Sequence, residues 1–384
     1  MMLWIFIILS IAYFLLTSTF LFGWLSIKKL PKNQQNNSHS TAVSIIIPVR
    51  NEEENILDLL SDIGNQEYPK DLIEVIVVDD NSEDATVDII QKNQDQFDFS
   101  LQLIEQKDEK PFNGSHKKRS ITQGVQLAKG ELIFNTDGDC RFKVGWIRDT
   151  VRLFRLGGYS FISGPVTFFR SKNLFEKLQT MEFSGLIGAG AASLNLGFPN
   201  MCNGANLAYT KKVFQEVNGF EGYEQLPSGD DEFLMQKIYK ISPSKVVFNR
   251  NASCIAYTSA KDSFKEFLFQ RRRWAGKWKF HKDIKIQLLA MFIFLFNLFT
   301  LSTFLCAVLG NCPMDIFFAG FVTRLIVDAL FTYNVLKFLG HRFSFFYFLI
   351  LELVYPLYVI FFGIISNFGQ YEWKGRILNH KIDE

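Results

Sequence analysis

The first 27 residues, Met1–Ile27, contain no charged side chain. An apolar segment of this length can span the ~30 Å hydrocarbon core of a bilayer, which needs about 20 residues. It has no basic stretch before the apolar run and no A-x-A-like cleavage site after it, which favours a transmembrane helix over a cleaved signal peptide. Lys28, Lys29 and Lys32 follow directly, and the positive-inside rule then predicts that the next part of the chain is cytoplasmic.

A second apolar region, residues 286–366, carries only the charged residues Asp315, Arg324, Asp328, Lys337, Arg342 and Glu352. Spans are expected at about 286–310, 316–336 and 343–366. Arg324 and Asp328 lie one helical turn apart, so they either pair inside a helix bundle or mark a segment in the membrane interface. The chain is therefore expected to be an integral membrane protein. Roughly 240 residues lie between its apolar ends, enough for one large domain.

Composition narrows the possible functions. The formal net charge of +2 gives no reason to expect a nucleic-acid partner. The five cysteines form no C-x-x-C pair, so no zinc site is predicted. All five are expected to be reduced, as a cytoplasmic domain would keep them. The five histidines lie apart from the motifs described below, which gives little support for histidine-based nucleophilic catalysis.

Strand and helix patterns alternate between residues 43 and 137. Continuous apolar runs predict strands at 43–49, 73–80, 100–106 and 131–137, and helical spacing predicts helices at 51–66, 82–93 and 117–130. Asn51 and Ser82 are the expected N-caps of the first two helices. Alternation with fully apolar strands predicts an α/β domain whose parallel sheet is covered on both faces. Ligands of such sheets bind at the carboxyl ends of the strands.

The fourth predicted strand ends in two carboxylates, Asp137 and Asp139, with one glycine between them. Like charges this close repel unless a positive group holds them. Oxygen ligands suit Mg²⁺ or Mn²⁺, and Mg²⁺ commonly completes its shell with substrate phosphates. The pair indicates either a divalent cation with a phosphorylated substrate, or a turn with two solvated acids.

Two further acidic pairs follow the same pattern. Asp79 and Asp80, followed by Asn81, end the second strand, where they either accept hydrogen bonds from a nucleobase or ribose, or belong to a helix cap. Asp230 and Asp231 open a later helix. The helix macrodipole stabilises acids there, and the alternative is that one of them is a general base.

Residues 262–282 interleave aromatic side chains with seven Lys or Arg between Lys265 and Lys282. A basic amphipathic helix of this kind is typical of a membrane surface. The segment "QRRRW", residues 270–274, lies within it, and its simplest role is contact with lipid headgroups. The small residues of 185–193, "GLIGAGAAS", are interpreted as a close packing surface, because no apolar strand precedes them as in a dinucleotide site.

In their order and spacing these motifs resemble the family 2 glycosyltransferases, in the membrane branch with a D, D, D, QxxRW signature. That branch includes cellulose, chitin and hyaluronan synthases and the ceramide glucosyltransferases, and the resemblance covers roughly residues 43–280. It implies an α/β nucleotide-diphospho-sugar transferase domain of the GT-A fold, with a Rossmann-like mixed sheet and flanking transmembrane helices. The expected parts are an N-terminal transmembrane helix (1–27), a linker (28–42), a cytoplasmic GT-A domain (43–260), an amphipathic interface helix (261–284), a region of two to three spans (285–368) and a basic tail (369–384).

The resemblance also implies roles for individual residues in the donor site. Pro48, Arg50 and Glu52 would line the nucleotide pocket. Asp80, beside Asp79, would read the base, usually uracil, and Lys118 would lie near the diphosphate. Asp137 and Asp139 match the D-x-D pair that holds ribose and metal, which makes Mg²⁺ or Mn²⁺ the expected cofactor.

The acceptor side is implied in the same way. Asp231 matches the second acid of the E-D motif and would be the catalytic base. Asp230 stands where the family usually has Glu, which leaves the base open between these two neighbours. Gln270, Arg273 and Trp274 match QxxRW, which closes over the pyrophosphate and the acceptor.

The implied reaction is an inverting, metal-dependent transfer of a sugar from a nucleotide sugar, expected to be a UDP-sugar, to an acceptor at the lipid bilayer. A lipid acceptor is favoured, because three downstream spans offer little material for a channel. The alternative is a processive polysaccharide synthase with a glycan acceptor, whose channel a partner subunit would complete. A non-catalytic scaffold is disfavoured, because all the acidic positions are present. The expected location is a bacterial-type inner or plasma membrane, with a role in building glycolipids of the cell envelope.

Overall fold

The computed structural model describes residues 2–29, 41–106 and 114–366, together with Phe368 and the backbone of 370–373 and 376–379. Most of the predicted linker and part of the basic tail lie outside these ranges. The chain forms two compact units. We call residues 27–169 and 193–259 the sheet unit, and residues 1–26, 170–192 and 260–381 the membrane unit. The expected domain bounds of 43–260 differ from this division, because residues 170–192 group with the membrane helices.

The first half of the sheet unit has the predicted alternation of strands and helices. In chain order its elements are β1 (Val43–Val49), α2 (Ile56–Gly64), β2 (Ile73–Asp79), α3 (Thr86–Asn93), β3 (Ser100–Glu105), α4 (His116–Leu127) and β4 (Leu132–Asn135). Apolar side chains of β1, β2 and β4 are buried apart from Pro48, as the continuous apolar runs predicted, whereas Leu103 and Ile104 of the edge strand β3 are partly exposed. The four strands pair in parallel in the order β3-β2-β1-β4.

The first two helices begin later than predicted, and Asn51 and Ser82 are not their N-caps. α2 starts at Ile56 and α3 at Thr86. Asn51 lies in the left-handed region with φ of 53°. Its side-chain oxygen accepts a hydrogen bond from the backbone N–H of Glu83, and its own N–H donates to the Ser82 hydroxyl. The two polar side chains therefore tie the loops after β1 and β2 together instead of capping helices.

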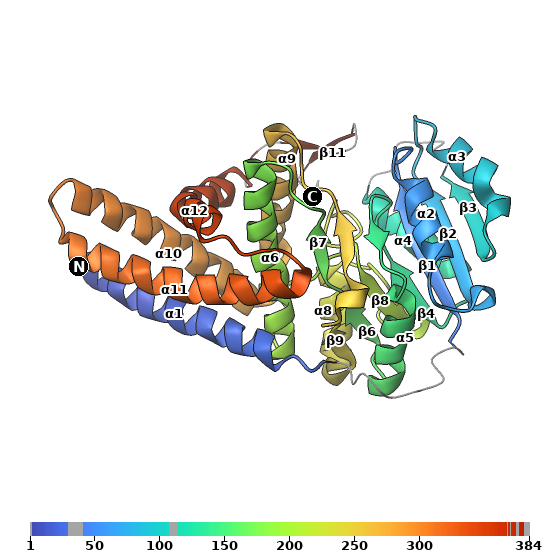
Figure 1. Cartoon of the computed structure of the whole chain (residues 1–384), viewed down its shortest axis with the longest axis horizontal. Helices are drawn as coiled ribbons and strands as arrows, with labels where there is room; N and C mark the ends of the chain where they lie inside the picture. Colours follow the sequence, from blue (N-terminus) through green and yellow to red (C-terminus); the bar gives the residue numbers. More distant parts are fainter. Residues whose placement is uncertain are drawn as a thin grey trace. The chain divides into compact units, whose positions relative to one another are not determined.

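The second half of the sheet unit makes the sheet mixed. Its elements are β5 (Arg141–Phe142), α5 (Trp146–Gly157), β6 (Phe161–Ser163), β7 (Val166–Phe168), β8 (Leu207–Thr210), α7 (Lys211–Glu216), α8 (Glu232–Ile241), β9 (Val246–Phe248) and β10 (Ala256–Thr258). β8 is antiparallel to both β4 and β6, and the full order is β3-β2-β1-β4-β8-β6-β9 (Figure 1). A second, three-stranded sheet has the order β5-β10-β7.

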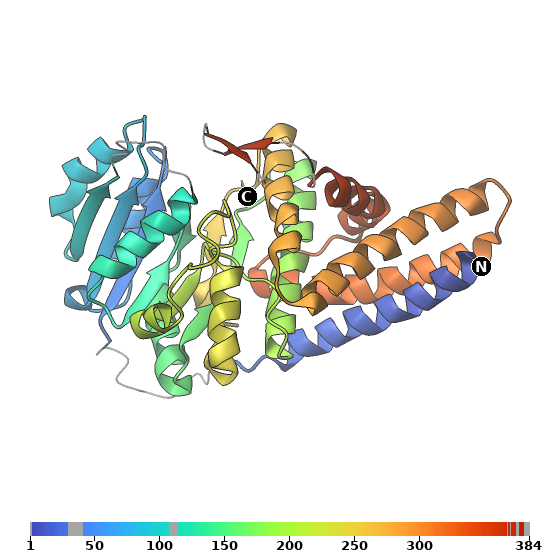
Figure 2. The same ribbon diagram turned by 180° about the vertical axis from the view of Figure 1, so that it is seen from behind.

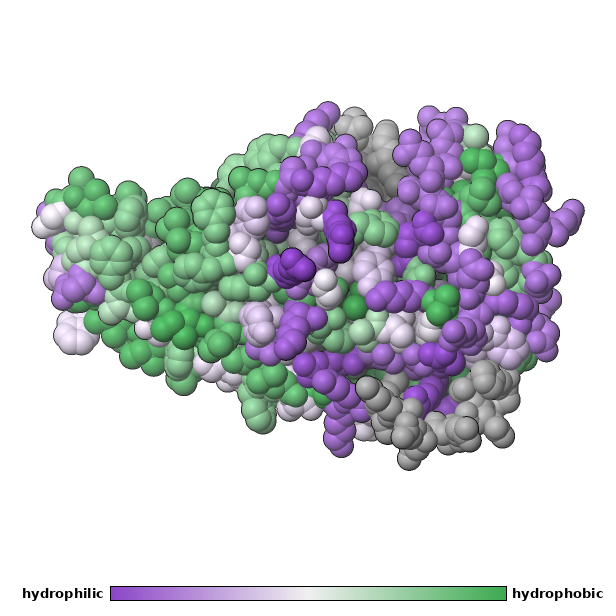
Figure 3. Space-filling view, in the orientation of Figure 1, coloured by the Kyte–Doolittle hydropathy of each residue, from purple (hydrophilic) through white to green (hydrophobic). Residues whose placement is uncertain are grey.

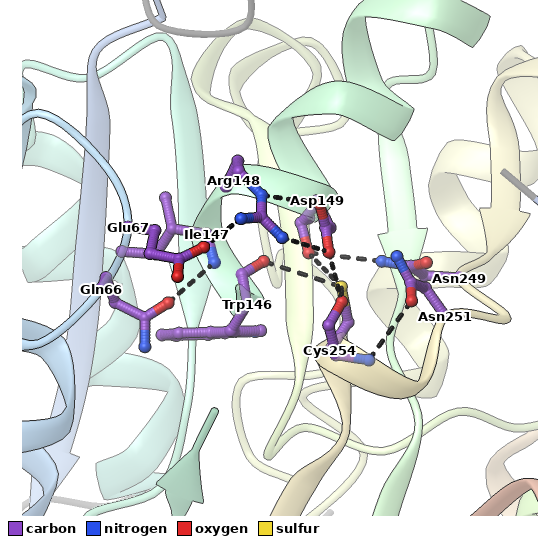
Figure 4. A network of polar contacts seen from close by, with 11 residues as sticks. Gln66, Glu67, Trp146, Ile147, Arg148, Asp149, Asn249, Asn251 and Cys254 are labelled. Carbon is purple, nitrogen blue, oxygen red and sulfur yellow. Dashed lines mark hydrogen bonds and ion pairs between the residues drawn. The ribbon is translucent and has the colours of Figure 1, made fainter. Parts of the chain in front are cut away.

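A polar network at the start of α5 holds the segment that leads into β10 (Figure 4). Asp149 is bound by the guanidinium of Arg148 and by the hydroxyl of Ser253, and the thiol of Cys254 points to the carbonyl oxygen of Trp146 at 3.7 Å. Burial by itself would raise the pKa of Asp149, but the hydrogen bonds from Arg148 and Ser253 hold it below its usual value. Burial raises the pKa of the Cys254 thiol to about 11, so this thiol is not a reactive group.

The membrane unit contains long apolar helices and a short hairpin. Its elements are α1 (Met2–Ser26), most of α6 (Leu174–Asn195), α9 (Phe264–Ala275), α10 (Ile284–Val308), α11 (Met314–Leu339), α12 (Phe345–Ile365), β11 (Gln370–Trp373) and β12 (Arg376–Asn379). Among the described residues, α1, α10 and α12 are long and apolar enough to cross a membrane. Figures 1 and 2 show α1, α10 and α11 side by side, with α12 seen end-on and thus running across their direction. Hydrophobic residues dominate the surface of these helices (Figure 3).

One buried arginine joins the helices of the membrane unit. Arg324 on α11 donates to Glu352 of α12 at 2.8 Å and to the side-chain oxygen of Asn297 of α10 at 3.1 Å, and it lies 3.4 Å from Asp328. Tyr13 of α1 donates to Asp328 at 2.8 Å. Arg324 and Asp328 therefore pair inside the bundle, which is one of the two arrangements that the sequence left open. These charges face the bundle interior, which is where charged residues of membrane helices are tolerated.

The cysteines divide into two groups. Cys306, in the last turn of α10, and Cys312, in the connection to α11, form a disulfide. Cys140, Cys202 and Cys254 form no disulfide among the described residues. The expectation that the cysteines are reduced is therefore wrong for the first pair, which lies outside the predicted cytoplasmic domain.

We predict opposite effects for two glycines of α6. A Cβ atom at Gly188 would lie 2.5 Å from Val335 and 2.9 Å from Phe331 of α11, whereas a Cβ atom at Gly185 meets nothing within 4 Å. Gly188→Ala is therefore expected to destabilise the protein by about 1–3 kcal/mol through overpacking. Gly185→Ala is expected to stabilise it by up to about 1 kcal/mol through helix propensity. Thermal unfolding in one detergent measures both, and equal effects would contradict close packing at Gly188.

Candidate functional site

The candidate site lies at the carboxyl ends of β1, β2 and β4. Val49, the last residue of β1, pairs with Asp79 of β2, and Ile46 of β1 pairs with Asn135 of β4. Parallel strands in this register end at one edge of the sheet, so the loops after them meet there. This arrangement brings together polar residues from three loops that are far apart in the sequence.

Arg50 and Asp79 organise the loop after β2. The buried guanidinium of Arg50 donates to the carbonyl oxygens of Asp80 and Asn81, at 2.8 and 2.5 Å, and pairs with Glu83 at 2.7 Å. Asp79 accepts hydrogen bonds from the backbone N–H and the hydroxyl of Ser82, at 3.1 and 2.5 Å. Both side chains shape the predicted nucleotide pocket by fixing its backbone.

Pro48 and Glu52 flank this loop on the side of β1. Pro48 lies within β1, opposite Val78 of β2. Glu52 is buried, and its carboxylate accepts from the side-chain amide of Asn55 at 2.9 Å. A Cβ atom at Gly138 would lie 2.9 Å from the Glu52 side chain, so only glycine fits between Asp137 and Asp139 without displacing it.

Asp80 has a partner that the sequence analysis did not single out. Its buried carboxylate lies 2.9 Å from the Nδ1 atom of His116, the first residue of α4. The expectation that all histidines lie apart from the motifs is therefore wrong for His116. The sequence feature that could have indicated His116 is its position directly before Lys117 and Lys118.

Lys117 is the positive group that faces the acidic residues. Its ammonium nitrogen lies 2.6 Å from Asp137 and 3.3 Å from Asp230. Burial by itself would lower the pKa of Lys117, but the two carboxylates hold it above its usual value. Burial would likewise raise the pKa of Asp230, but Lys117, with Lys118, holds it below its usual range. Lys117 was not among the residues predicted from the sequence, although its neighbour Lys118 was.

Lys118, the predicted diphosphate contact, has a different environment. Its side chain is buried, and its ammonium group donates to the carbonyl oxygens of Tyr223, Leu226 and Ser228 at 2.7, 2.8 and 2.9 Å. These three bonds use all three donors of an ammonium group. Lys118 thereby holds the loop that leads into Asp230, and its assignment as a diphosphate contact remains a prediction.

Asp231 is the N-cap of α8. Its carboxylate accepts from the backbone N–H of Glu232 at 2.8 Å and from that of Gly204 at 3.1 Å. A Cβ atom at Gly204 would lie 2.9 Å from Asp230, so the backbone approaches both acids closely at this point. Asp231 is partly exposed and Asp230 is buried.

Asp139 faces the second sheet. Its carboxylate accepts from the hydroxyl of Thr258, at the end of β10, at 3.0 Å, and lies 3.8 Å from the Cys140 thiol. Among the described residues, no group of three or more His, Cys, Asp or Glu is arranged to hold a metal ion. Mg²⁺ sites with one or two carboxylates, completed by substrate phosphates, do not need such a group. The oxygen donors of Asp137 and Asp139 fit a cation of this kind.

The remaining predicted residues belong to the membrane unit. Gln270, Arg273 and Trp274 lie on α9, which confirms a helix in the basic amphipathic segment, although it ends at Ala275. The Trp274 ring stacks on Phe183 of α6 with centroids 5.8 Å apart. The group of acids with Lys117 thus belongs to the sheet unit, and the QRRRW segment belongs to the membrane unit.

Comparison with known proteins gives consistent matches. The profile of Glycosyl transferase family 2 matches residues 44–217, and that of Glycosyl transferase family group 2 matches residues 132–365. The probable glycosyltransferase YdaM of Bacillus subtilis is 25% identical over 263 residues, which cover 65% of this chain and 58% of YdaM. A poly-beta-1,6-N-acetyl-D-glucosamine synthase of Staphylococcus epidermidis is 23% identical over 266 residues, which cover 66% and 60%. The chain thus spans somewhat more than half the length of these curated relatives.

One solved structure resembles the whole chain. The mannosyltransferase PcManGT from Pyrobaculum calidifontis, in complex with GDP-Man and Mn²⁺, has a TM-score of 0.54 and 16% sequence identity. The match covers 96% of each chain. At this identity the likeness concerns the fold.

We predict that Lys118→Met destabilises the loop of residues 223–228. The substitution leaves three carbonyl oxygens without their donor, at a cost of about 1–3 kcal/mol for each buried acceptor that stays unsatisfied. The expected result is faster limited proteolysis within this loop and a lower unfolding temperature. Lys117→Met is the matched control, because it removes the same charge one residue away without touching these carbonyls. Equal proteolysis of this loop in the two variants would contradict the assignment.

Proposed function

Because the chain belongs to the membrane-associated family 2 glycosyltransferases of the GT-A fold, we propose that it transfers a sugar from a UDP-sugar to a lipid acceptor in the membrane. The observation that carries the proposal is the group of carboxylates around Lys117 at the carboxyl end of the sheet. Nucleotides bind at this edge in open α/β sheets. A lysine among acids suits a substrate that carries both a diphosphate and a hydroxyl-rich sugar.

The donor would bind with its base toward Asp80 and its diphosphate toward Lys117. Asp80 is held by His116, and Arg50 fixes the backbone around it, so the pocket wall is organised in advance. Lys117 is the lysine whose ammonium group faces the acids, which favours it over Lys118 as the diphosphate contact. The fold neighbour PcManGT was solved with GDP-Man, which supports a nucleotide-sugar donor.

Asp137 and Asp139 would hold Mg²⁺ or Mn²⁺. A divalent cation bound there would offset the charge that develops on the diphosphate leaving group. Thr258 donates to Asp139 and orients its carboxylate, a role that partners of metal ligands commonly have. PcManGT was solved with Mn²⁺, which supports divalent metal use.

Release of UDP that continues unchanged in the presence of a chelator would contradict this part of the proposal.

Asp231 would act as the general base. It would take the proton of the acceptor hydroxyl, whose oxygen would attack the anomeric carbon while the bond to the diphosphate breaks. One displacement of this kind inverts the configuration. Asp230 is a weaker candidate, because its pairing with Lys117 holds its pKa down and reduces its affinity for a proton.

The lipid acceptor is favoured by the interior of the membrane unit. Arg324, Asp328 and Glu352 are buried and engaged with one another, which leaves these charges committed to helix packing. A processive synthase would need polar groups that line a path for a glycan. The likeness to a poly-N-acetylglucosamine synthase keeps that reaction as the second candidate.

We also propose that α1 and α10 cross the membrane, that α11 crosses beside them with its charges Arg324 and Asp328 paired inside the bundle, and that the sheet unit is cytoplasmic. Disulfides persist in oxidising compartments, so the Cys306–Cys312 bond favours an outer location for the α10–α11 turn. The other end of α10 is then cytoplasmic, in agreement with Lys28 and Lys29 after α1. Because α12 runs across these three helices, we do not count it as a span. The two remaining spans after the sheet unit, α10 and α11, then return the chain to the cytoplasm.

After mild reduction of intact cells, a membrane-impermeant maleimide should label both Cys306 and Cys312. Labelling only in permeabilised cells would overturn the orientation.

We predict a glycolipid product. Membranes that contain the protein are incubated with radiolabelled UDP-sugars and Mn²⁺, and the products are partitioned between organic solvent and water. Label is expected in the organic phase, because the acceptor hydroxyl belongs to a lipid. Membranes with Asp139→Asn protein are the control. Label found only in a high-mass, water-soluble polymer would contradict the lipid acceptor and favour the processive alternative.

We predict that Asp231→Asn lowers kcat by at least about 100-fold, as the loss of a general base does. Binding of UDP, measured by calorimetry, is expected to persist, because the base acts on the acceptor. Asparagine also accepts the hydrogen bond from Glu232, so the cap of α8 is retained. Asp230→Asn is the matched comparison. If Asp231→Asn is active and Asp230→Asn is not, the base is the other neighbour.

A further inference from the structure

Arg271 is the second residue of QRRRW, at a position that the QxxRW signature leaves unspecified. Its side chain is only 2% exposed. It donates to the side-chain oxygen of Gln270 at 2.7 Å, and its guanidinium lies over the Trp274 ring, 4.3 Å from the centroid. Arg271 thus contacts both the glutamine and the tryptophan of the signature.

Arg271 is itself held by two other helices. Its guanidinium donates to Glu182 of α6 at 2.5 Å, and the hydroxyl of Tyr358 of α12 donates to the other oxygen of the same carboxylate at 2.8 Å. Glu182 is also buried. Both carboxylate oxygens are therefore engaged, one by α9 and one by α12.

The chemistry of the network requires arginine at this position. A buried ion pair adds little stability by itself, but loss of one partner leaves a charge without compensation, so the geometry is strongly constrained. The planar guanidinium can bind Glu182 and Gln270 with different nitrogens while it stacks on an indole. A lysine ammonium group is a point charge and cannot make these three contacts in one fixed geometry.

We propose that Arg271 is a positioning residue, which sets the side chains of Gln270 and Trp274 and is oriented by Glu182 and Tyr358. The C-terminal helix α12 thereby controls the geometry of the QRRRW segment, through one carboxylate. This inference rests on the proposed function, in which that segment closes over pyrophosphate and acceptor. It predicts that a change on α12, far along the sequence from any acidic motif, alters catalysis.

Tyr358→Phe tests the proposal, because it removes one hydroxyl and keeps the ring. In purified protein with UDP-sugar and Mn²⁺, kcat is expected to fall by about 10- to 100-fold, as a small misplacement of a catalytic group does. The donor KM is expected to stay within about twofold. Tyr347→Phe is the matched control on the same helix, since its hydroxyl is also hydrogen-bonded, in this case as the acceptor from Lys177 of α6. It is expected to keep the wild-type kcat.

Arg271→Lys separates positioning from charge. The variant keeps the positive charge and is expected to fold with a similar unfolding temperature while it loses kcat to at least the same extent as Tyr358→Phe. If the wild type is active and both variants keep its kcat, the role of Arg271 as a positioning residue is overturned. The proposed function is not affected by that result. If the wild type turns over no UDP-sugar, the proposed function fails, and hydrogen exchange decides this inference. Faster exchange of residues 264–275 in Tyr358→Phe than in Tyr347→Phe supports it, and equal exchange overturns it.

Discussion

Repulsion between carboxylates at the carboxyl end of the sheet is the constraint on which the candidate site depends. Parallel pairing delivers Asp80 and Asp137 to the same edge, and the turn before α8 adds Asp230 and Asp231. These acids are compatible only if positive charge lies among them. Lys117 supplies it, through direct contact with Asp137 and Asp230. This arrangement is the basis for the proposed binding of a diphosphate and a cation at this edge of the sheet.

The same rule organises the interior of the membrane unit, where Arg324 and Arg271 are both buried. Arg324 is buried against two carboxylates, and its partners lie on α10, α11 and α12. Arg271 is buried against Glu182, which is also bound from α12. Pairs of this kind select which helices become neighbours, because any other arrangement leaves a charge unpaired. The two arginines therefore specify helix arrangement in the apolar part of the chain.

Adjacent residues with the same side chain have separate roles in this protein. Lys117 and Lys118 are the second and third residues of α4, where successive side chains point about 100° apart around the helix. One ammonium group consequently faces the acids, and the other faces the carbonyl oxygens of residues 223–228. Asp230 and Asp231 differ in the same way, with one bound to lysine and the other to backbone N–H groups. A motif read from sequence identifies such a pair but does not assign its members.

The sequence by itself determined the apolar helices, the four parallel strands and the acidic residues at their ends. These follow from local periodicity and from charge, which do not depend on distant contacts. Only the tertiary structure decided that Lys117 faces the acids, that His116 binds Asp80, that Thr258 binds Asp139 and that Arg271 joins three helices. Each of these contacts links elements that are far apart along the chain. These contacts depend on strand order and helix packing, which arise when the whole apolar surface is buried. No local sequence pattern encodes them.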